Sequence, residues 1–221
     1  MLFDLMTGGV QNAVLSILIV IPIVLMALTF HEFAHAYAAY KLGDPTAKMT
    51  GRLSLNPLKH LDLFGTIAIL IAGIGWAKPV PVNSRYFKKP KYGMAITALA
   101  GPLMNLLLAF IGLTLFALYY RFASERVYNE GVALFFYFMG YLNCYLAVFN
   151  LLPVPPFDGS RLAFVILPDR LYWKVMQYER IIMLVVIVAI LGLSRIGLNP
   201  FGIVADLIVD GIMNLYSMIL L

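Results

Sequence analysis

Hydrophobic residues in this chain fall into long blocks that are separated by short polar segments. One block runs from about Gln11 to Tyr40, and its part from Val14 to Phe30 carries no charged residue. Two further blocks, Gly93–Tyr120 and Gly131–Leu152, also reach the ~20 helical residues that are needed to cross the hydrocarbon core of a bilayer. The pattern therefore predicts a membrane-spanning helix in each of these three blocks, and with the other apolar segments the sequence leaves five or six spans open.

The remaining apolar segments are shorter or interrupted. Leu63–Trp76 is glycine-rich and covers only about 14 residues, so we expect a re-entrant or interfacial element there. Lys78–Asn83 alternates with proline and is expected to be an extended edge segment. Ile181–Leu193 is a marginal span, and Phe201–Leu221 is a further apolar segment. The expected fold class is an all-α polytopic membrane protein, a helix bundle with a small re-entrant or edge β element.

Composition agrees with a membrane protein. Hydrophobic residues make up 62% of the 221 residues and charged residues 12%, whereas soluble domains carry about 25% charged residues. The net charge of +5 comes from Lys and Arg in short loops, which argues against nucleic-acid binding. Because cytoplasmic loops collect Lys and Arg, we expect the basic loops 41–61 and 77–92 on the cytoplasmic side of the cell membrane. A single cysteine, Cys144, excludes an internal disulfide and a cysteine-based zinc site.

The central motif is His31-Glu32-Phe33-Ala34-His35, an H-E-x-x-H pattern on a predicted helix. Residues four apart share a helix face, so both imidazoles can reach one Zn²⁺, and the offset Glu32 can take a proton from a zinc-bound water. Ionisable residues inside an apolar helix are costly and are functional by default. His31 lies roughly 15 Å of helix before Lys41, which places the metal inside the membrane near its cytoplasmic face. The third histidine, His60, is expected to be solvated in a basic loop.

A catalytic zinc needs a third protein ligand. Asp158 has the strongest context among the acidic candidates, because three prolines in the preceding segment place its carboxylate on irregular backbone. Irregular backbone at membrane depth must be buried in protein or line a cavity. Asp44 and Asp62 fit solvated turn roles in the basic loop, and Asp206 and Asp210 share a face of the last helix, where they would cap or pair.

Two further motifs accompany H-E-x-x-H. Asn150–Gly159 reads N-x-x-P-x-x-x-x-D-G, and Gly101–Asn105 reads G-P-x-x-N. Over about residues 11–165 the chain thereby resembles the site-2 protease family of intramembrane zinc metalloproteases. The resemblance implies that His31, His35 and Asp158 are zinc ligands and that Glu32 is the general base. It also implies that the side-chain amides of Asn150 and Asn105 bind substrate.

The resemblance also implies a function and a domain organisation. We expect a zinc metalloendopeptidase that hydrolyses peptide bonds in or near transmembrane segments of membrane-protein substrates within the lipid bilayer. Residues 1–221 would form a single transmembrane protease domain, with a catalytic core at about 11–165 and C-terminal helices at about 178–221. No stretch is long or polar enough for the PDZ domain of many relatives, so this would be a compact form. The sequence leaves the oligomeric state open.

Two other functions stay open at this stage. A non-enzymatic membrane zinc-binding or transport protein would also bury His and Asp, because such residues mark ion pathways. Transporters more often carry their ion ligands on several helices of an internally repeated fold. Here the candidate zinc ligands converge on one site with a glutamate next to it. A metal-dependent lipid hydrolase is the third candidate, although no G-x-S-x-G nucleophile elbow is present.

Overall fold

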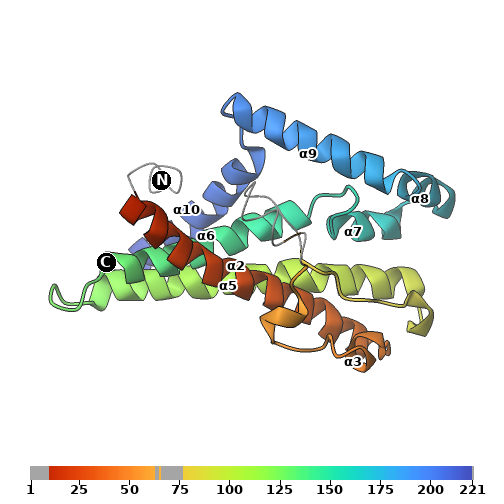
Figure 1. Cartoon of the computed structure of the whole chain (residues 1–221), viewed down its shortest axis with the longest axis horizontal. Coiled ribbons are helices and arrows are strands. Elements are labelled where there is room, and N and C mark those ends of the chain that lie inside the picture. The colour runs from red at the N-terminus through yellow and green to blue at the C-terminus, as the bar shows by residue number, and fades with distance from the viewer. Residues whose placement is uncertain (1–9, 63–64, 66–76, 221) are drawn as a thin grey trace.

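The computed structural model describes residues 10–62, 65 and 77–220, which are mainly helical (Figure 1). The long helices are α2 (Val10–Lys41), α5 (Pro90–Phe122), α6 (Glu130–Asn150), α9 (Glu179–Arg195) and α10 (Pro200–Leu220). The short ones are α3 (Thr46–Met49), α7 (Gly159–Ile166) and α8 (Asp169–Met176), with single 3-10 turns η1 (Pro57–Lys59) and η2 (Ser84–Tyr86).

Four of the described helices, α2, α5, α6 and α10, are long and apolar enough to cross a membrane. They coincide with the apolar blocks of the sequence, so the prediction of an all-α polytopic bundle is confirmed. The β element amounts, in the described residues, to one isolated antiparallel bridge between Leu61 and Ala77. Most of the segment 63–76, for which a re-entrant element was predicted, lies outside the described residues.

Helix α5 is the centre of the bundle and packs against α2, α6, α7 and α10. One apolar cluster joins α2, α5 and α6, and a second joins α5, α6 and α10. Because lipid tails are as apolar as these side chains, close packing rather than hydrophobicity holds such helices together. Gly112 of α5 and Gly140 of α6 permit this packing, since a Cβ at residue 112 would lie 2.6 Å from the Gly140 nitrogen.

The end of α2 is shaped by Gly43, whose φ of 107° lies in the left-handed region that favours glycine. Gly43 N–H donates to the Tyr40 carbonyl at 3.1 Å, and Asp44 N–H donates to the Ala39 carbonyl at 2.9 Å. These two hydrogen bonds form a Schellman motif, which provides donors for backbone carbonyl groups that have no partner within the helix. It ends α2 at Lys41, next to Tyr40, where the apolar block of the sequence ends.

Two residues of the loop after α2 are buried, which corrects the expectation that they are solvated. Asp44 is 0% exposed, and its carboxylate accepts the backbone N–H groups of Thr46 at 2.9 Å and Asn83 at 2.6 Å. His60 is 1% exposed, and its Nε2 lies 2.7 Å from the Ser54 carbonyl. Both side chains satisfy backbone groups of a folded loop, so their polarity serves internal hydrogen bonding.

The connection from α6 to α7 brings Asp158 back over α2. Asp158 immediately precedes α7, which packs against α5. The chain is tightly folded here, because a Cβ at Gly159 would lie 2.1 Å from the Leu151 carbonyl oxygen. A glycine after the aspartate therefore lets the turn close against the end of α6.

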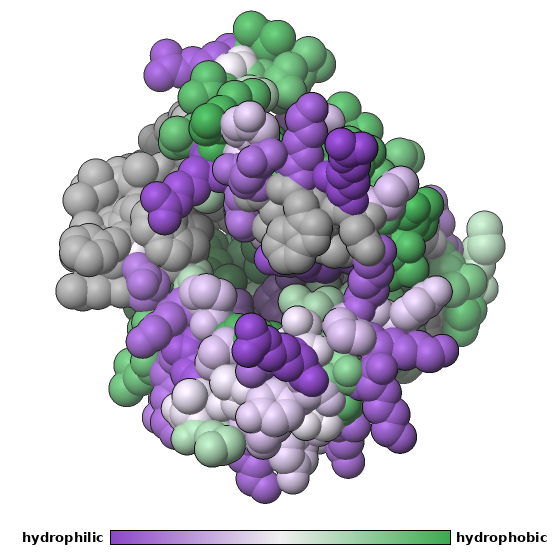
Figure 2. Space-filling view, turned by 90° about the vertical axis from the view of Figure 1, so that its right-hand side faces the viewer, coloured by the Kyte–Doolittle hydropathy of each residue, from purple (hydrophilic) through white to green (hydrophobic). Residues whose placement is uncertain are grey.

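The end of the molecule that carries α3 and α8 is hydrophilic, as Figure 2 shows. The polar part of the chain between α2 and α5 carries exposed lysines, including Lys48, Lys59, Lys88 and Lys89. Along the bundle, by contrast, apolar side chains of α2 and α5 such as Leu18 and Leu107 are exposed. This distribution is the one expected of helices that face lipid and of a loop region that faces water.

Candidate metal centre

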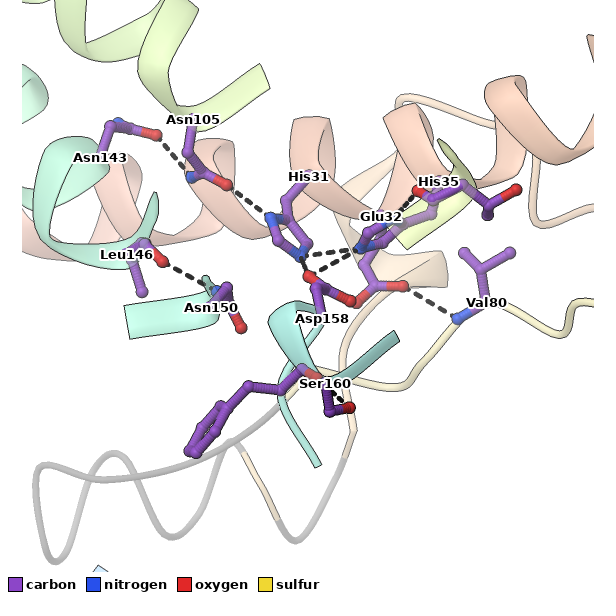
Figure 3. A network of polar contacts seen from close by, with 12 residues as sticks. His31, Glu32, His35, Val80, Asn105, Asn143, Leu146, Asn150, Asp158 and Ser160 are labelled. Carbon is purple, nitrogen blue, oxygen red and sulfur yellow. Dashed lines mark hydrogen bonds and ion pairs between the residues drawn. The ribbon is translucent and has the colours of Figure 1, made fainter. Parts of the chain in front are cut away.

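Three ligand-type side chains converge between α2 and the start of α7 (Figure 3). The Nε2 atoms of His31 and His35 lie 3.0 Å apart, and Asp158 Oδ2 lies 3.1 Å from the first and 3.2 Å from the second. Among the acidic candidates of the sequence, Asp158 is the one that joins this cluster in the described structure. The structure thus brings together the three residues predicted to bind zinc.

Hydrogen bonds on the far side of each ring determine which nitrogen carries the proton. His31 Nδ1 lies 2.5 Å from Asn105 Oδ1, and His35 Nδ1 lies 2.7 Å from the Thr97 carbonyl oxygen. A carbonyl oxygen only accepts, so both Nδ1 atoms donate. In the neutral imidazoles the lone pairs are then at Nε2, and both point to Asp158.

The amide of Asn105 is itself oriented by a second asparagine. Asn105 Nδ2 donates to Asn143 Oδ1 at 2.9 Å, and Asn143 Nδ2 donates to the Met139 carbonyl at 2.8 Å. Both asparagines are fully buried, and Figure 3 shows them in line behind His31. This chain of donors and acceptors turns the Asn105 oxygen toward His31, as outer partners of ligating histidines commonly do.

The cluster fits a zinc ion. Its three ligand atoms are acceptors that face one another at 3.0–3.2 Å, and Asp158 Oδ2 is buried without a hydrogen-bond donor. Ligand atoms at ~2.0–2.2 Å from a tetrahedral zinc lie roughly 3.3 Å from one another, and two imidazoles with one carboxylate form a known catalytic donor set. Converging lone pairs of this kind call for a cation.

Burial by itself raises the pKa of the Asp158 carboxyl group. When His31 and His35 are protonated, their hydrogen bonds to the carboxylate and their positive charge outweigh this effect and hold that pKa well below its usual range. Asp158 is therefore ionised at neutral pH, as a metal-ligating carboxylate must be.

Glu32 lies beside the cluster without being part of it, as Figure 3 shows. Its side chain is 9% exposed, and its Oε2 accepts the backbone N–H of Val80 at 2.9 Å. The donor belongs to the extended proline-containing segment that sequence analysis had singled out. One oxygen of Glu32 is thus fixed by this hydrogen bond.

The two asparagines predicted to bind substrate occupy different positions. Asn105 is held between His31 and Asn143, so both ends of its amide contact protein. Asn150 lies at the end of α6, where its Nδ2 donates to the Leu146 carbonyl at 3.0 Å. Substrate binding by either residue stays a prediction.

Sequence analysis missed Asn143 and the Thr97 carbonyl. No motif includes Asn143, although an asparagine inside an apolar block is a signal, because buried polar groups in spanning helices find partners. The Thr97 contact is made by backbone and has no sequence signal. Both lie on helices that only the packing of the bundle brings to α2.

Comparison with known proteins identifies the family of this chain. The model of peptidase family M50 matches residues 119–193. The "Putative zinc metalloprotease YwhC" of Bacillus subtilis is 49% identical over 173 residues, which cover 76% of this chain and 79% of that protein. The "Putative zinc metalloprotease Rip2" of Mycolicibacterium smegmatis is 35% identical over 140 residues, which cover 61% of this chain and 52% of that protein. No solved structure matches. The chain belongs to peptidase family M50, the site-2 protease family.

Proposed function

We propose that this protein is an intramembrane zinc metalloendopeptidase whose zinc is held by His31, His35 and Asp158 and whose general base is Glu32. The observation that carries the proposal is the convergence of three acceptor atoms. Two of them belong to the apolar helix α2, which also carries Glu32 beside them. Membership of family M50 and the names of the relatives support the reaction class. The proposed catalytic unit is a single transmembrane domain.

A bound zinc ion would lower the pKa of a coordinated water to about 7 and polarise a substrate carbonyl. Glu32 is placed to accept the proton of the attacking water and to deliver it to the leaving amine. Its Oε2 is engaged by Val80 N–H, which leaves Oε1 for this transfer. Asp158 and the two imidazoles supply a net charge of −1, which partly neutralises the cation.

The proposed substrates are transmembrane segments of membrane proteins. A helix must unwind locally before its backbone can be cut, so the substrate would reach the site as an extended strand. Asn150, at the end of α6 and partly buried, is proposed to contact the substrate backbone through its side-chain amide. Asn105 is proposed to act through His31.

The proposed orientation places the site toward the cytoplasm. His31 and His35 lie in the last third of α2, which ends at the hydrophilic face of Figure 2. The loops on that face are rich in Lys, and such loops remain cytoplasmic in most multi-pass proteins. Water would reach the site from this face.

The decisive experiment combines metal analysis with cleavage. The purified protein is reconstituted in liposomes with single-span test substrates that carry a Gly-Pro pair in the cytoplasmic third of the span, and products are identified by mass spectrometry. We expect Glu32→Gln to abolish cleavage and keep one zinc per chain, and His31→Ala to lose both. Glu125→Gln, a change in an exposed loop, is the matched control. Full activity of Glu32→Gln would remove Glu32 from the mechanism, and zinc flux into the liposomes that survives this change would favour a transporter.

A further inference from the structure

Residues 77–83, here called the proline segment, are pinned to the loop that follows α2. Lys78 N–H donates to the His60 carbonyl at 2.9 Å, beside the bridge between Leu61 and Ala77. At the other end of the segment, Asn83 N–H donates to the Asp44 carboxylate at 2.6 Å. The segment is therefore fixed at both ends, although it forms no sheet with the described residues.

Arg52 provides a third attachment. Its guanidinium donates to the carbonyl oxygen of Lys78 and, at 3.3 Å, to that of Pro79. Arg52 is 8% exposed, and Asp44 at the other end is fully buried. Burying a charged group is costly unless hydrogen bonds compensate, so two buried charges that serve one short segment fix its position strongly.

The prolines restrict what the middle of this segment can donate. Pro79 and Pro81 have no backbone N–H, so Val80 supplies the one N–H group of residues 79–81. That group donates to Glu32 Oε2 at 2.9 Å. The next N–H, that of Val82, has no hydrogen-bond partner in the described structure.

We propose that the proline segment positions the catalytic base: Val80 N–H fixes one carboxylate oxygen of Glu32, while Arg52 and Asp44 hold the segment in place. This inference rests on the proposed role of Glu32 as the base. An unrestrained Glu side chain loses conformational entropy when it is ordered, and the segment removes much of this freedom before substrate binds. Val80, Arg52 and Asp44 are positioning residues, since they act through Glu32.

The first test removes single N–H groups by proline substitution in the zinc-loaded protein. Val80→Pro deletes the N–H that contacts Glu32, Val82→Pro deletes one without an acceptor, and Val80→Ala keeps the N–H but shortens the side chain. We expect kcat to fall about 10- to 100-fold in Val80→Pro, with KM and zinc content unchanged, because small misplacements of a catalytic group cost about this much. Val80→Ala, which keeps the N–H, and Val82→Pro, which removes an N–H that has no acceptor, should each lose far less of the parent rate than Val80→Pro. Equal rates for the two proline variants would overturn the inference.

A second measurement does not depend on activity. Hydrogen exchange resolved to single amides should find Lys78, Val80 and Asn83 protected and Val82 unprotected. Glu32→Ala should accelerate exchange at Val80 alone, while Arg52→Ala should accelerate it at all three protected amides. Arg85→Ala, a change of an exposed arginine, should alter none of them.

The two tests separate this inference from the proposed function. An unchanged Val80 exchange rate in Glu32→Ala would refute the positioning contact whether or not the protein cleaves peptides. If the parent protein shows no cleavage but the exchange pattern is as expected, the contact exists and the protease assignment fails. If the parent cleaves and Val80→Pro cleaves equally well, the protease assignment stands and the positioning role fails.

Discussion

Gly101 of α5 lies directly against the imidazole of His35 of α2. A Cβ at residue 101 would come within 2.5 Å of both Cε1 and Nε2 of that ring, and within 2.6 Å of Cε1 of His31. Hydrogen is thus the largest group that fits between the backbone of α5 and the two proposed zinc ligands. The glycine of G-P-x-x-N lets α5 pass close enough for its Thr97 carbonyl and Asn105 side chain to hold the rings.

Gly101→Ala should therefore disrupt the metal centre without unfolding the bundle. The added methyl group forces both rings to move, and the ligand atoms then lose their convergence. We expect at least a tenfold loss of zinc affinity, in the range reported for disturbed partners of ligating histidines, with unchanged helical circular dichroism. Gly211→Ala in α10 is the matched control, because nothing lies within 4 Å of a Cβ there. Full zinc loading of Gly101→Ala at low free zinc would contradict the arrangement.

Asn143 should affect zinc binding although it touches no ligand. Without its Oδ1, the Asn105 amide can rotate and present its NH₂ group to His31, which would favour the imidazole tautomer that has no lone pair at Nε2. We expect Asn143→Ala to weaken zinc binding by about 10- to 100-fold, measured by competition with a chromogenic chelator. Asn214→Ala, an exposed change in α10, should have no effect. Equal affinities of the two variants would show that the hydrogen bonds from Asn143 through Asn105 do not orient His31.

Local spacing accounts for the part of the site that the sequence predicted. The i, i+4 spacing of His31 and His35 determines that both rings lie on one face of α2, and a run of apolar residues is sufficient to predict α2 itself. Asp158 could be selected because its proline-broken context is unusual and belongs to a two-part motif. For these residues, the chemistry and the local backbone are both encoded within a few positions.

The unpredicted parts depend on contacts between distant segments. His35 meets Thr97 across 62 residues, and Asn105 meets Asn143 across 38. Asp44 looks like a solvated turn residue until the proline segment packs on it, and α7 is too short, at 8 residues, for a helical period to stand out. No single-sequence pattern encodes which helices pack together, so these contacts required the structure.

Zinc should stabilise the folded protein, because it binds three acceptor atoms that otherwise repel one another. A ligand at 100 times its Kd adds about 2.7 kcal/mol to the free energy of unfolding, which a thermal scan in detergent detects readily. We expect zinc to raise the Tm of the chelator-treated protein and to leave that of Asp158→Asn nearly unchanged. Asp210→Asn should respond like the parent, because this exposed carboxylate lies outside the cluster. The opposite pattern would assign the third ligand to α10.

Residue 112 of α5 should tolerate a larger side chain as poorly as residue 101 does. A substitution there should first lower the stability of the bundle, because Gly112 packs on α6. A Cβ at residue 112 would meet the backbone of Gly140, which cannot swing aside as a side chain would. We expect Gly112→Ala to lower the free energy of unfolding in mixed micelles by about 1–3 kcal/mol, the usual cost of overpacking.

Gly112→Ala also reaches the metal centre through helix geometry. Residue 112 lies two turns after Asn105 on the same face of α5, and Gly140 lies one turn before Asn143 on α6. Separating the helices at the glycines therefore lengthens the Asn105–Asn143 hydrogen bond, and zinc affinity should fall together with stability. Gly211→Ala should instead be neutral or gain roughly 0.5–1 kcal/mol, because alanine is the better helix former. If Gly112→Ala loses stability but keeps its zinc affinity, the Asn105–Asn143 hydrogen bond does not depend on the close packing of α5 and α6.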